Sequence, residues 1–187
     1  METAIKKSLE ILRNGGIILY PTDTVWGIGC DATREDAVGK IYTLKQRPER
    51  KSMLVLLDNA GRLSQYMQEV PDIAFDLIEQ AVNPLTIIYP GAKNLAPNLV
   101  AGDQSIGIRI TSDEFCNRLI ARFGKPIVST SANISSQPAP AIFDEISEEI
   151  LQGVDYVAEW RQDEISRSKP SGIIKLGVNG EVIVIRE

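Results

Sequence analysis

The sequence contains no histidine and only two cysteines, Cys30 and Cys116, among its 187 residues. Histidine is the commonest general base and the commonest metal ligand of proteins, so the chain must do its chemistry without an imidazole. A structural zinc site needs four Cys or His ligands and is therefore not expected. The two cysteines form no close-spaced motif, and we interpret them as reduced thiols of a cytoplasmic protein.

Long hydrophobic runs are also missing. No apolar segment approaches the roughly 20 residues that a transmembrane helix needs, and residues 1–7 lack the apolar core of a secretory signal, so no membrane contact is expected. The net charge of −5 and the pI of about 4.9 argue against a surface devoted to nucleic acid. The length and the 43% hydrophobic content predict one domain, residues 1–187, with a substantial core.

Helical and strand patterns alternate along the chain, which is typical of an α/β fold. A first helix is expected to start at Thr3, as its cap, and to end at Gly15-Gly16. Further helices are expected at 35–45, 59–68, 71–81, 113–123 (with Asp113 near the N-cap) and 144–152. Strands are expected at 17–20, 53–57, 85–89, 106–110, 126–129, 154–158, 172–176 and 182–186. Some strands follow one another without an intervening helix, so the sequence predicts a mixed sheet.

A polar loop, P-T-D-T-V-W-G-I-G at 21–29, directly follows the strand expected at 17–20. Ligands of α/β sheets favour loops at the carboxyl ends of strands, and glycine permits a close approach of the backbone to a ligand. A plain connecting turn explains the loop equally well. The same stretch contains a G-x-G-x-x-A pattern at 27–32, but six residues separate it from the strand, so it does not match a dinucleotide-binding turn.

Four cations lie within the seven residues K-Q-R-P-E-R-K at 45–51. Such a cluster on an acidic chain indicates one concentrated anion site, and a nucleotide polyphosphate is the expected guest. Cations also complement the C-terminal end of a helix, but that role does not require four of them.

Other polar residues stand at the ends of expected strands. The run S-T-S-A-N at 129–133 offers several N–H and O–H donors, although an ordinary turn has the same composition. Arg109 interrupts an apolar strand, so its head is either paired or faces a cleft. Arg186 ends the last apolar strand, where a charge in water is the commoner arrangement.

Taken in order, these segments resemble the single-domain form of the YrdC-like threonylcarbamoyl-AMP synthase family. The resemblance runs from about residue 17 to residue 186, and each piece is weak alone. The matching segments are Pro21–Gly29, Lys45–Pro48, Pro84–Thr86, Gly107–Arg109, Ser131–Asn133, Ser171 and Arg186.

The resemblance implies an α/β fold, a twisted mixed sheet flanked by helices with a concave cationic groove. It implies synthesis of threonylcarbamoyl-AMP and pyrophosphate from L-threonine, bicarbonate and ATP, for the t6A modification of tRNA. Mg²⁺ is expected to arrive with ATP, because no carboxylate cluster marks a metal site of the protein. A downstream transferase is the implied partner, and direct tRNA binding is expected to be weak.

The resemblance also implies roles for individual residues. The residues implied to be catalytic, by gripping the phosphates, are Lys45 and Arg47. The residues implied to bind the nucleotide are Arg47, Ser105, Ser131, Asn133 and Arg186, with Lys51 as an extra phosphate contact. The residues implied to bind threonine are Thr24, Arg109, Ser129 and Ser171.

Two alternatives remain open at this point. A YrdC-like paralogue that acts on another carbamoyl or acyl adenylate would keep the same groove. A non-catalytic RNA-binding module is a different class of protein, which the acidic net charge disfavours.

Overall fold

The computed structural model describes residues 1–49 and 51–187, so Arg50 of the cationic cluster lies outside the described residues. The strands are β1 (Ile18–Tyr20), β2 (Gly27–Gly29), β3 (Leu54–Leu57), β4 (Leu85–Tyr89), β5 (Ile106–Ile110), β6 (Ile127–Ser131), β7 (Tyr156–Val157), β8 (Gly172–Leu176) and β9 (Val182–Arg186). The α-helices are α1 (Glu2–Arg13), α2 (Glu35–Leu44), α3 (Leu63–Tyr66), α4 (Asp72–Gln80), α5 (Glu114–Phe123) and α6 (Glu148–Gly153), and the short 3₁₀ helices are η1 (Ala60–Arg62) and η2 (Phe143–Glu145).

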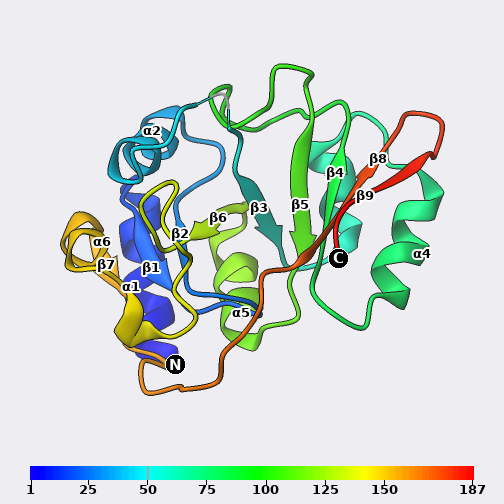
Figure 1. Ribbon diagram of the computed structural model, residues 1–187. Coiled ribbons are helices and arrows are strands. Elements are labelled where there is room, and N and C mark those ends of the chain that lie inside the picture. Colours follow the sequence, from blue (N-terminus) through cyan, green and yellow to red (C-terminus); the bar gives the residue numbers. More distant parts are fainter. Residues whose placement is uncertain (50) are drawn as a thin grey trace.

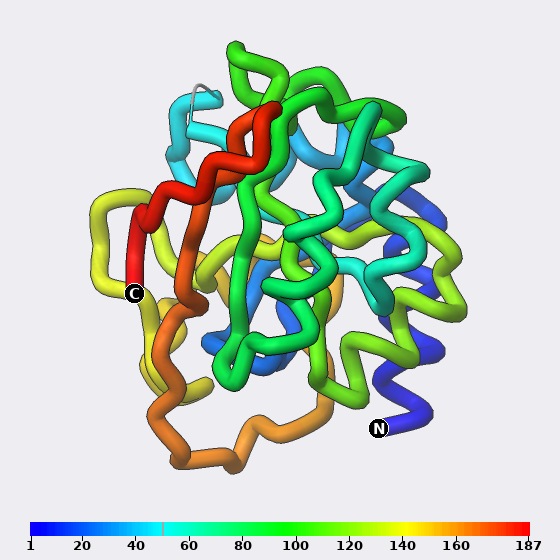
Figure 2. The backbone as a smooth tube through the Cα atoms, turned by 90° about the vertical axis from the view of Figure 1, so that its right-hand side faces the viewer, coloured from blue at the N-terminus to red at the C-terminus, as the bar shows by residue number. Residues whose placement is uncertain are grey.

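The strands form one twisted sheet in the order β7-β1-β2-β6-β3-β5-β4-β8-β9 (Figure 1). The pairs β1–β7, β3–β5 and β4–β8 are parallel, and the other pairs are antiparallel, which confirms the predicted mixed sheet. The connection from β7 to β8 crosses from one end of the sheet to the other half, and Figure 2 shows β8 and β9 (orange to red) as the outer hairpin.

Alternation of side chains along the strands creates two hydrophobic cores, one on each face. On one face, Val55 and Leu57 of β3 pack with α2, α3, α4 and α6. On the other face, Leu56 of the same strand packs with α1 and α5, which lie side by side (Figure 1). A residue's parity along its strand therefore decides which helices it meets.

The strand register extends the α1/α5 face into a polar region. Leu56 is paired across the sheet with both Ile127 and Arg109. Continuing outward from Arg109, the next residues of the same row are Thr86, Ile173 and Arg186. Residues in register on neighbouring strands point to the same face. The apolar half of this row lies under the two helices, whereas its polar half lies beyond them.

Most expected elements are found, and the differences have local causes. The bounds of β4, β5, β8 and β9 match the prediction, as does the Asp113 cap, whose Oδ1 accepts a hydrogen bond from the Cys116 N–H at 2.9 Å. The predicted Thr3 cap is wrong, because α1 already begins at Glu2 and has no side-chain cap. The helix expected at 144–152 is split into η2 and α6.

The strand β2 was not predicted, because it consists of only three residues and two of them are glycine. It lies between β1 and β6, where a Cβ on Gly29 would be 2.5 Å from the Val128 carbonyl oxygen and 2.6 Å from Tyr20 Cε1. Gly29 therefore serves the close approach of neighbouring strands. Both glycines of the G-x-G-x-x-A pattern lie in an antiparallel strand rather than in a strand-to-helix turn, as the spacing from the first strand had indicated for a pattern that does not match a dinucleotide-binding turn.

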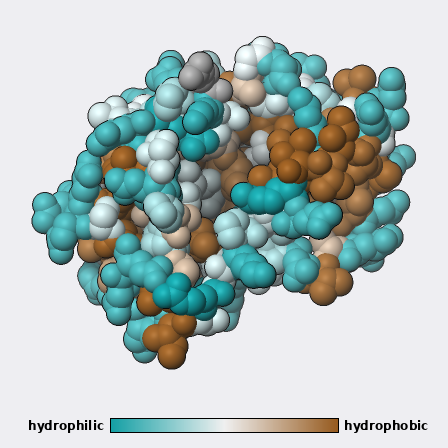
Figure 3. Space-filling view, in the orientation of Figure 1, coloured by the Kyte–Doolittle hydropathy of each residue, from teal (hydrophilic) through white to brown (hydrophobic). Residues whose placement is uncertain are grey.

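The outer hairpin is unusually apolar on its surface. Val182, Ile183, Val184 and Ile185 of β9 are all exposed, and Figure 3 shows brown side chains gathered over this part of the molecule. Across the described ranges, no helix has the length and apolar character required to cross a membrane.

Candidate functional site

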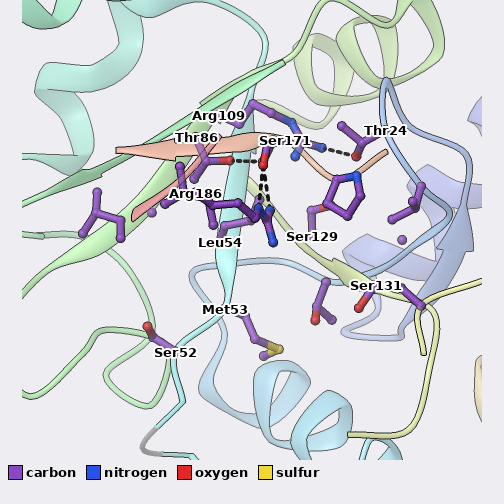
Figure 4. Close-up of a pocket in the computed structure, with 18 of the residues that line it drawn as sticks. Thr24, Ser52, Met53, Leu54, Thr86, Arg109, Ser129, Ser131, Ser171 and Arg186 are labelled. Atoms are coloured by element: carbon purple, nitrogen blue, oxygen red, sulfur yellow. Dashed lines mark hydrogen bonds between the residues drawn. The ribbon is translucent and has the colours of Figure 1, made fainter. Parts of the chain in front are cut away.

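A cavity of about 420 Å³ opens over the polar half of the cross-sheet row (Figure 4). The predicted site residues that line it are Thr24, Arg47, Ser105, Arg109, Ser129, Ser131, Ser171 and Arg186. They come from six separate segments of the chain, between the β1–β2 loop and the last strand. The fold thus brings together residues that lie far apart in the sequence and that had been related only through the order of their motifs.

Three predicted residues do not line the cavity. Lys51 is exposed on the turn before β3, and its backbone N–H donates to the Pro48 carbonyl. Asn133 lies two residues beyond Ser131, on the loop after β6, and Lys45 is buried beneath that loop. Direct contact of these three residues with a ligand stays a prediction.

Arg109 and Thr24 meet at one end of the cavity (Figure 4). The Arg109 guanidinium donates from Nη2 to Thr24 Oγ1 at 3.2 Å and lies 3.0 Å from Asp23 Oδ1. Arg109 is 3% exposed, so the Asp23 charge is needed to balance it. The contact is an ion pair rather than a hydrogen bond, since both Asp23 oxygens and Arg109 Nε lack partners with hydrogen-bond geometry. Thr22 fixes this loop by donating from Oγ1 to the Val25 carbonyl at 2.8 Å.

A second cluster joins three strands at the middle of the cavity. The hydroxyls of Thr86 and Ser171 lie 2.8 Å apart and share a hydrogen bond. Arg186 donates from Nε and Nη2 to the Ser171 carbonyl, at 2.9 and 2.7 Å. The Arg186 side chain, although exposed, is therefore tied to Ser171, whose hydroxyl contacts Thr86 of β4.

The loop after β6 is tied internally and to α2. Ser131 Oγ donates to Asn133 Oδ1 at 2.5 Å, and Asn133 Nδ2 donates to the Gln137 carbonyl at 2.7 Å. The Lys45 ammonium donates to the carbonyls of Ser131 and Asn133. Burial lowers the pKa of Lys45 to about 8, and the positive charge of Arg47 acts in the same direction.

Arg47 occupies the other end of the cavity. It donates from Nε to the Lys51 carbonyl and from Nη2 to the Ser52 carbonyl, both at 2.8 Å. Burial lowers the pKa of Arg47, yet an arginine keeps its charge in proteins. The backbone bonds hold the guanidinium in place before any ligand arrives.

Cationic side chains line the cavity although the chain is acidic, and two of them, Arg109 and Lys175, are paired with Asp23 and Asp103. Among the described lining residues the cations are Arg47, Arg109, Lys175 and Arg186, and none of those residues carries a carboxylate. Within the same described part of the chain, no group of three or more Cys, Asp or Glu side chains is placed to hold a metal ion. This lining suits an anion that carries several charges.

Sequence reasoning counted Asp23 only as the carboxylate of the candidate loop at 21–29 and assigned no site role to Thr86 or Lys175. Thr86 belongs to the P-L-T segment at 84–86. Its register partner on β5 is Arg109, so the two side chains point to the same face of the sheet. Lys175 shares a face with Ile173 on β8, and its ammonium lies 2.9 Å from Asp103 Oδ2. Asp103 in turn accepts a hydrogen bond from Ser105 Oγ at 2.5 Å. Only the strand order brings β8 beside β4, so this cation could not be placed from the sequence.

The structure is an α/β fold with a mixed sheet and a cavity that four cationic side chains line. A sequence model of the Sua5/YciO/YrdC family, described as "Telomere recombination", matches residues 10–187. The chain belongs to this family.

Relatives with assigned names are similar over almost the whole chain. The threonylcarbamoyl-AMP synthase of Pseudoalteromonas translucida is 32% identical over 184 residues, which cover 97% of each chain. The threonylcarbamoyl-AMP synthase of Hahella chejuensis is 36% identical over 171 residues, 90% of this chain and 91% of the relative.

Solved structures have the same fold. E. coli YciO superposes with a TM-score of 0.86 at 26% identity, covering 100% of this chain and 90% of that one. P. abyssi Sua5 complexed with L-threonine gives a TM-score of 0.82 at 25% identity. That match covers 92% of this chain and 50% of the Sua5 chain, so the present chain spans about half the length of that protein.

Proposed function

We propose that the chain is an L-threonylcarbamoyladenylate synthase, a nucleotidyltransferase that makes threonylcarbamoyl-AMP and pyrophosphate from L-threonine, bicarbonate and ATP. The observation that carries the proposal is the convergence of the family motifs on one cavity that contains four cations and, among its described lining residues, no carboxylate. The two relatives named threonylcarbamoyl-AMP synthase support the same substrate set.

Bicarbonate first takes up a proton and loses water, which gives CO₂, and two steps follow in this proposal. The amine of threonine adds to CO₂ and loses a proton, which gives a carbamate. A carbamate oxygen then attacks the α-phosphorus of ATP, and the bond to the bridging oxygen breaks as pyrophosphate leaves. Such chemistry depends on alignment and on stabilising the charge of the phosphates, so a cavity without histidine is adequate.

The end of the cavity formed by Thr24 and Arg109 is proposed to bind threonine. Arg109 lines the cavity and is a charged donor for the carboxylate. Ser129 on β6 and Ser171, directly before β8, also line the cavity and would contact the polar groups of the amino acid.

The end formed by Arg47 and Ser131 is proposed to bind the nucleotide. Arg47 is fixed by two backbone carbonyls and can offer its remaining donors to phosphate. Ser105 and Arg186 complete the predicted nucleotide contacts that line the cavity, and Lys175 adds a third cation to Arg47 and Arg186.

The described lining residues do not form a magnesium site, because they contain no carboxylate. Mg²⁺ would therefore enter as part of the substrate, bound to the phosphates of ATP. We further propose that residues 1–187 form one domain and act in the cytoplasm. The product would pass to a separate threonylcarbamoyl transferase, with little direct contact between this chain and tRNA.

The test is pyrophosphate release by the purified protein, with mass spectrometry of the adenylate formed. We expect release only when L-threonine, bicarbonate and ATP are all present, and a sharp decrease in Arg47→Ala. The matched control is Arg13→Ala, which removes a surface arginine from α1. ATP binding without release would contradict the proposal and would favour a paralogue that acts on another carbamoyl or acyl adenylate.

A further inference from the structure

Lys45 is placed differently from the other cations of its cluster. Its side chain is 1% exposed and does not line the cavity, whereas Arg47, two residues later, does. Gln46 between them has a φ of 50°, a left-handed conformation that ends α2 and separates the directions of its two neighbours. The two cationic side chains of the K-x-R motif therefore lie in different environments, Lys45 in the protein interior and Arg47 at the cavity.

The Lys45 side chain is used to hold a loop. Its ammonium donates to the carbonyl of Ser131 and, at 2.5 Å, to the carbonyl of Asn133. The backbone takes part as well, because the Lys45 carbonyl accepts a hydrogen bond from the Ser135 N–H at 2.8 Å. Lys45 thus holds every second residue of this segment, namely Ser131, Asn133 and Ser135.

The arrangement also fixes the position of the Lys45 positive charge beneath the loop. An ammonium removed from water requires compensation, and here the two carbonyl oxygens supply it. Lys45 has no carboxylate partner among the described residues, so the two carbonyls stabilise the ammonium without neutralising its charge. Ser131, whose carbonyl it holds, presents its side chain to the cavity.

We propose that Lys45 is a positioning residue for nucleotide binding, which fixes the Ser131–Asn133 loop through its carbonyls rather than contacting the phosphates. The proposal deepens the proposed function and rests on it for the identity of the nucleotide. It differs from the direct phosphate contact that the family resemblance implies for this lysine.

The first test uses the free protein and needs no substrate. Lys45→Met keeps an apolar chain of similar length and removes the ammonium. Hydrogen–deuterium exchange of the segment 131–137 should accelerate about tenfold, a size typical of losing hydrogen bonds to a charged group. The matched control is Lys40→Met, because Lys40 on the same helix also donates to a backbone carbonyl, that of Gly15, far from this loop. Exchange of 131–137 should not change in the control.

The second test separates the two substrates. The dissociation constant of a non-hydrolysable ATP analogue should rise about tenfold in Lys45→Met, while that of L-threonine stays within about twofold. Lys45→Gln, which keeps two N–H donors on a shorter chain, should recover part of both losses. A variant that merely unfolds would lose both affinities and is recognised by circular dichroism; Lys45→Gln then carries the test.

The outcomes are distinct. Weaker nucleotide binding with unchanged loop exchange would mean direct phosphate contact and would overturn the proposal. Faster exchange with unchanged nucleotide affinity would overturn it too, since the loop would not serve the nucleotide. Failure of the unaltered protein to bind the analogue would refute the proposed function instead, and the exchange experiment would still show whether Lys45 holds the loop.

Discussion

Arg109 combines two properties that are seldom found in one residue. It is buried against a counter-ion, Asp23, and it still lines the cavity. From the sequence, the Arg109 guanidinium was expected either to have an ionic partner or to face a cleft, and the structure shows both. Because Asp23 is the partner, a substrate carboxylate that approaches Arg109 meets a guanidinium already fixed in direction, at a small cost in conformational entropy.

We expect Arg109→Ala to raise the KM for threonine by about 10- to 100-fold and the KM for ATP by less than about threefold. Steady-state kinetics with each substrate varied in turn measures the difference. The substitution leaves Asp23 buried without its partner, so Asp23→Asn with Arg109→Ala is the companion variant. An effect confined to ATP would show that Arg109 belongs to the nucleotide end.

Stability should depend on pH through Lys45. Its folded pKa of about 8 lies below the ordinary 10.5, so between these values the unfolded chain binds more protons than the folded one. Folding stability then rises with pH across this window, by up to about 1.4 kcal/mol per pH unit. Denaturant unfolding at pH 8 and pH 10 should show a gain for the unaltered protein relative to Lys45→Met. An equal difference at both pH values would contradict the buried-ammonium account.

The sequence predicted which residues gather at the cavity better than how their side chains are placed. Thr24, Arg109 and Ser171 were singled out by their motifs, and all three line the cavity. The separate directions of Lys45 and Arg47 could not be predicted, because helical periodicity ends at Leu44 and the left-handed turn at Gln46 has no signature in a glutamine. Directions of side chains beyond a helix end depend on tertiary contacts.

At the scale of elements, α5 is fixed at its start by one carboxylate with two contacts. Asp113 caps the helix through the Cys116 N–H, and its Oδ2 lies 2.7 Å from Arg161 Nη1 on the β7–β8 connection. The helix and the connection that leads to Ser171 are therefore anchored at the same point.

Asp113→Ala should lower the free energy of unfolding by about 1–2 kcal/mol, mainly through loss of the cap. Asp113→Asn keeps an oxygen acceptor and loses the ion pair, so we expect a smaller loss, about 0.2–1 kcal/mol. Urea denaturation of the three proteins gives the comparison. Equal losses in both variants would assign the stability to the ion pair instead of the cap.

Elements were predictable where a pattern is long and the ends are marked. The periodic apolar residues of α5 and the alternating β5 gave correct bounds. The strand β2 was missed because Gly27-Ile28-Gly29 has no strand propensity, and its place results from pairing on both sides with β1 and β6.

At the scale of the whole molecule, the site depends on strand order. Arg109, Thr86, Ile173 and Arg186 form one row only because β4 lies between β5 and β8. The sequence predicted a mixed sheet, but its order is decided by crossovers that leave no local pattern. The order of the motifs could therefore suggest a single site, but the relative positions of its side chains could be seen only in the folded structure.

The contrast between an acidic chain and a cationic cavity predicts a dependence on salt. Raising the ionic strength from about 50 to about 500 mM should weaken binding of an ATP analogue by about 3- to 10-fold, because salt screens its charges. Binding of threonine, a zwitterion, should change by less than about twofold. Calorimetric titrations at several salt concentrations measure both. Equal salt dependence for the two ligands would contradict a specific role of the cations in holding phosphates.

Arg186 lies on the outermost strand, whose single neighbour is β8 and whose side chains are exposed. The wall of the cavity is thus completed by the part of the sheet that opens at the lowest free energy. On warming, β9 should separate from β8 while both cores stay packed, because no residue of β9 belongs to either core. Catalysis would then fade, reversibly, at temperatures where circular dichroism still reports a folded chain, and bound nucleotide would delay the loss.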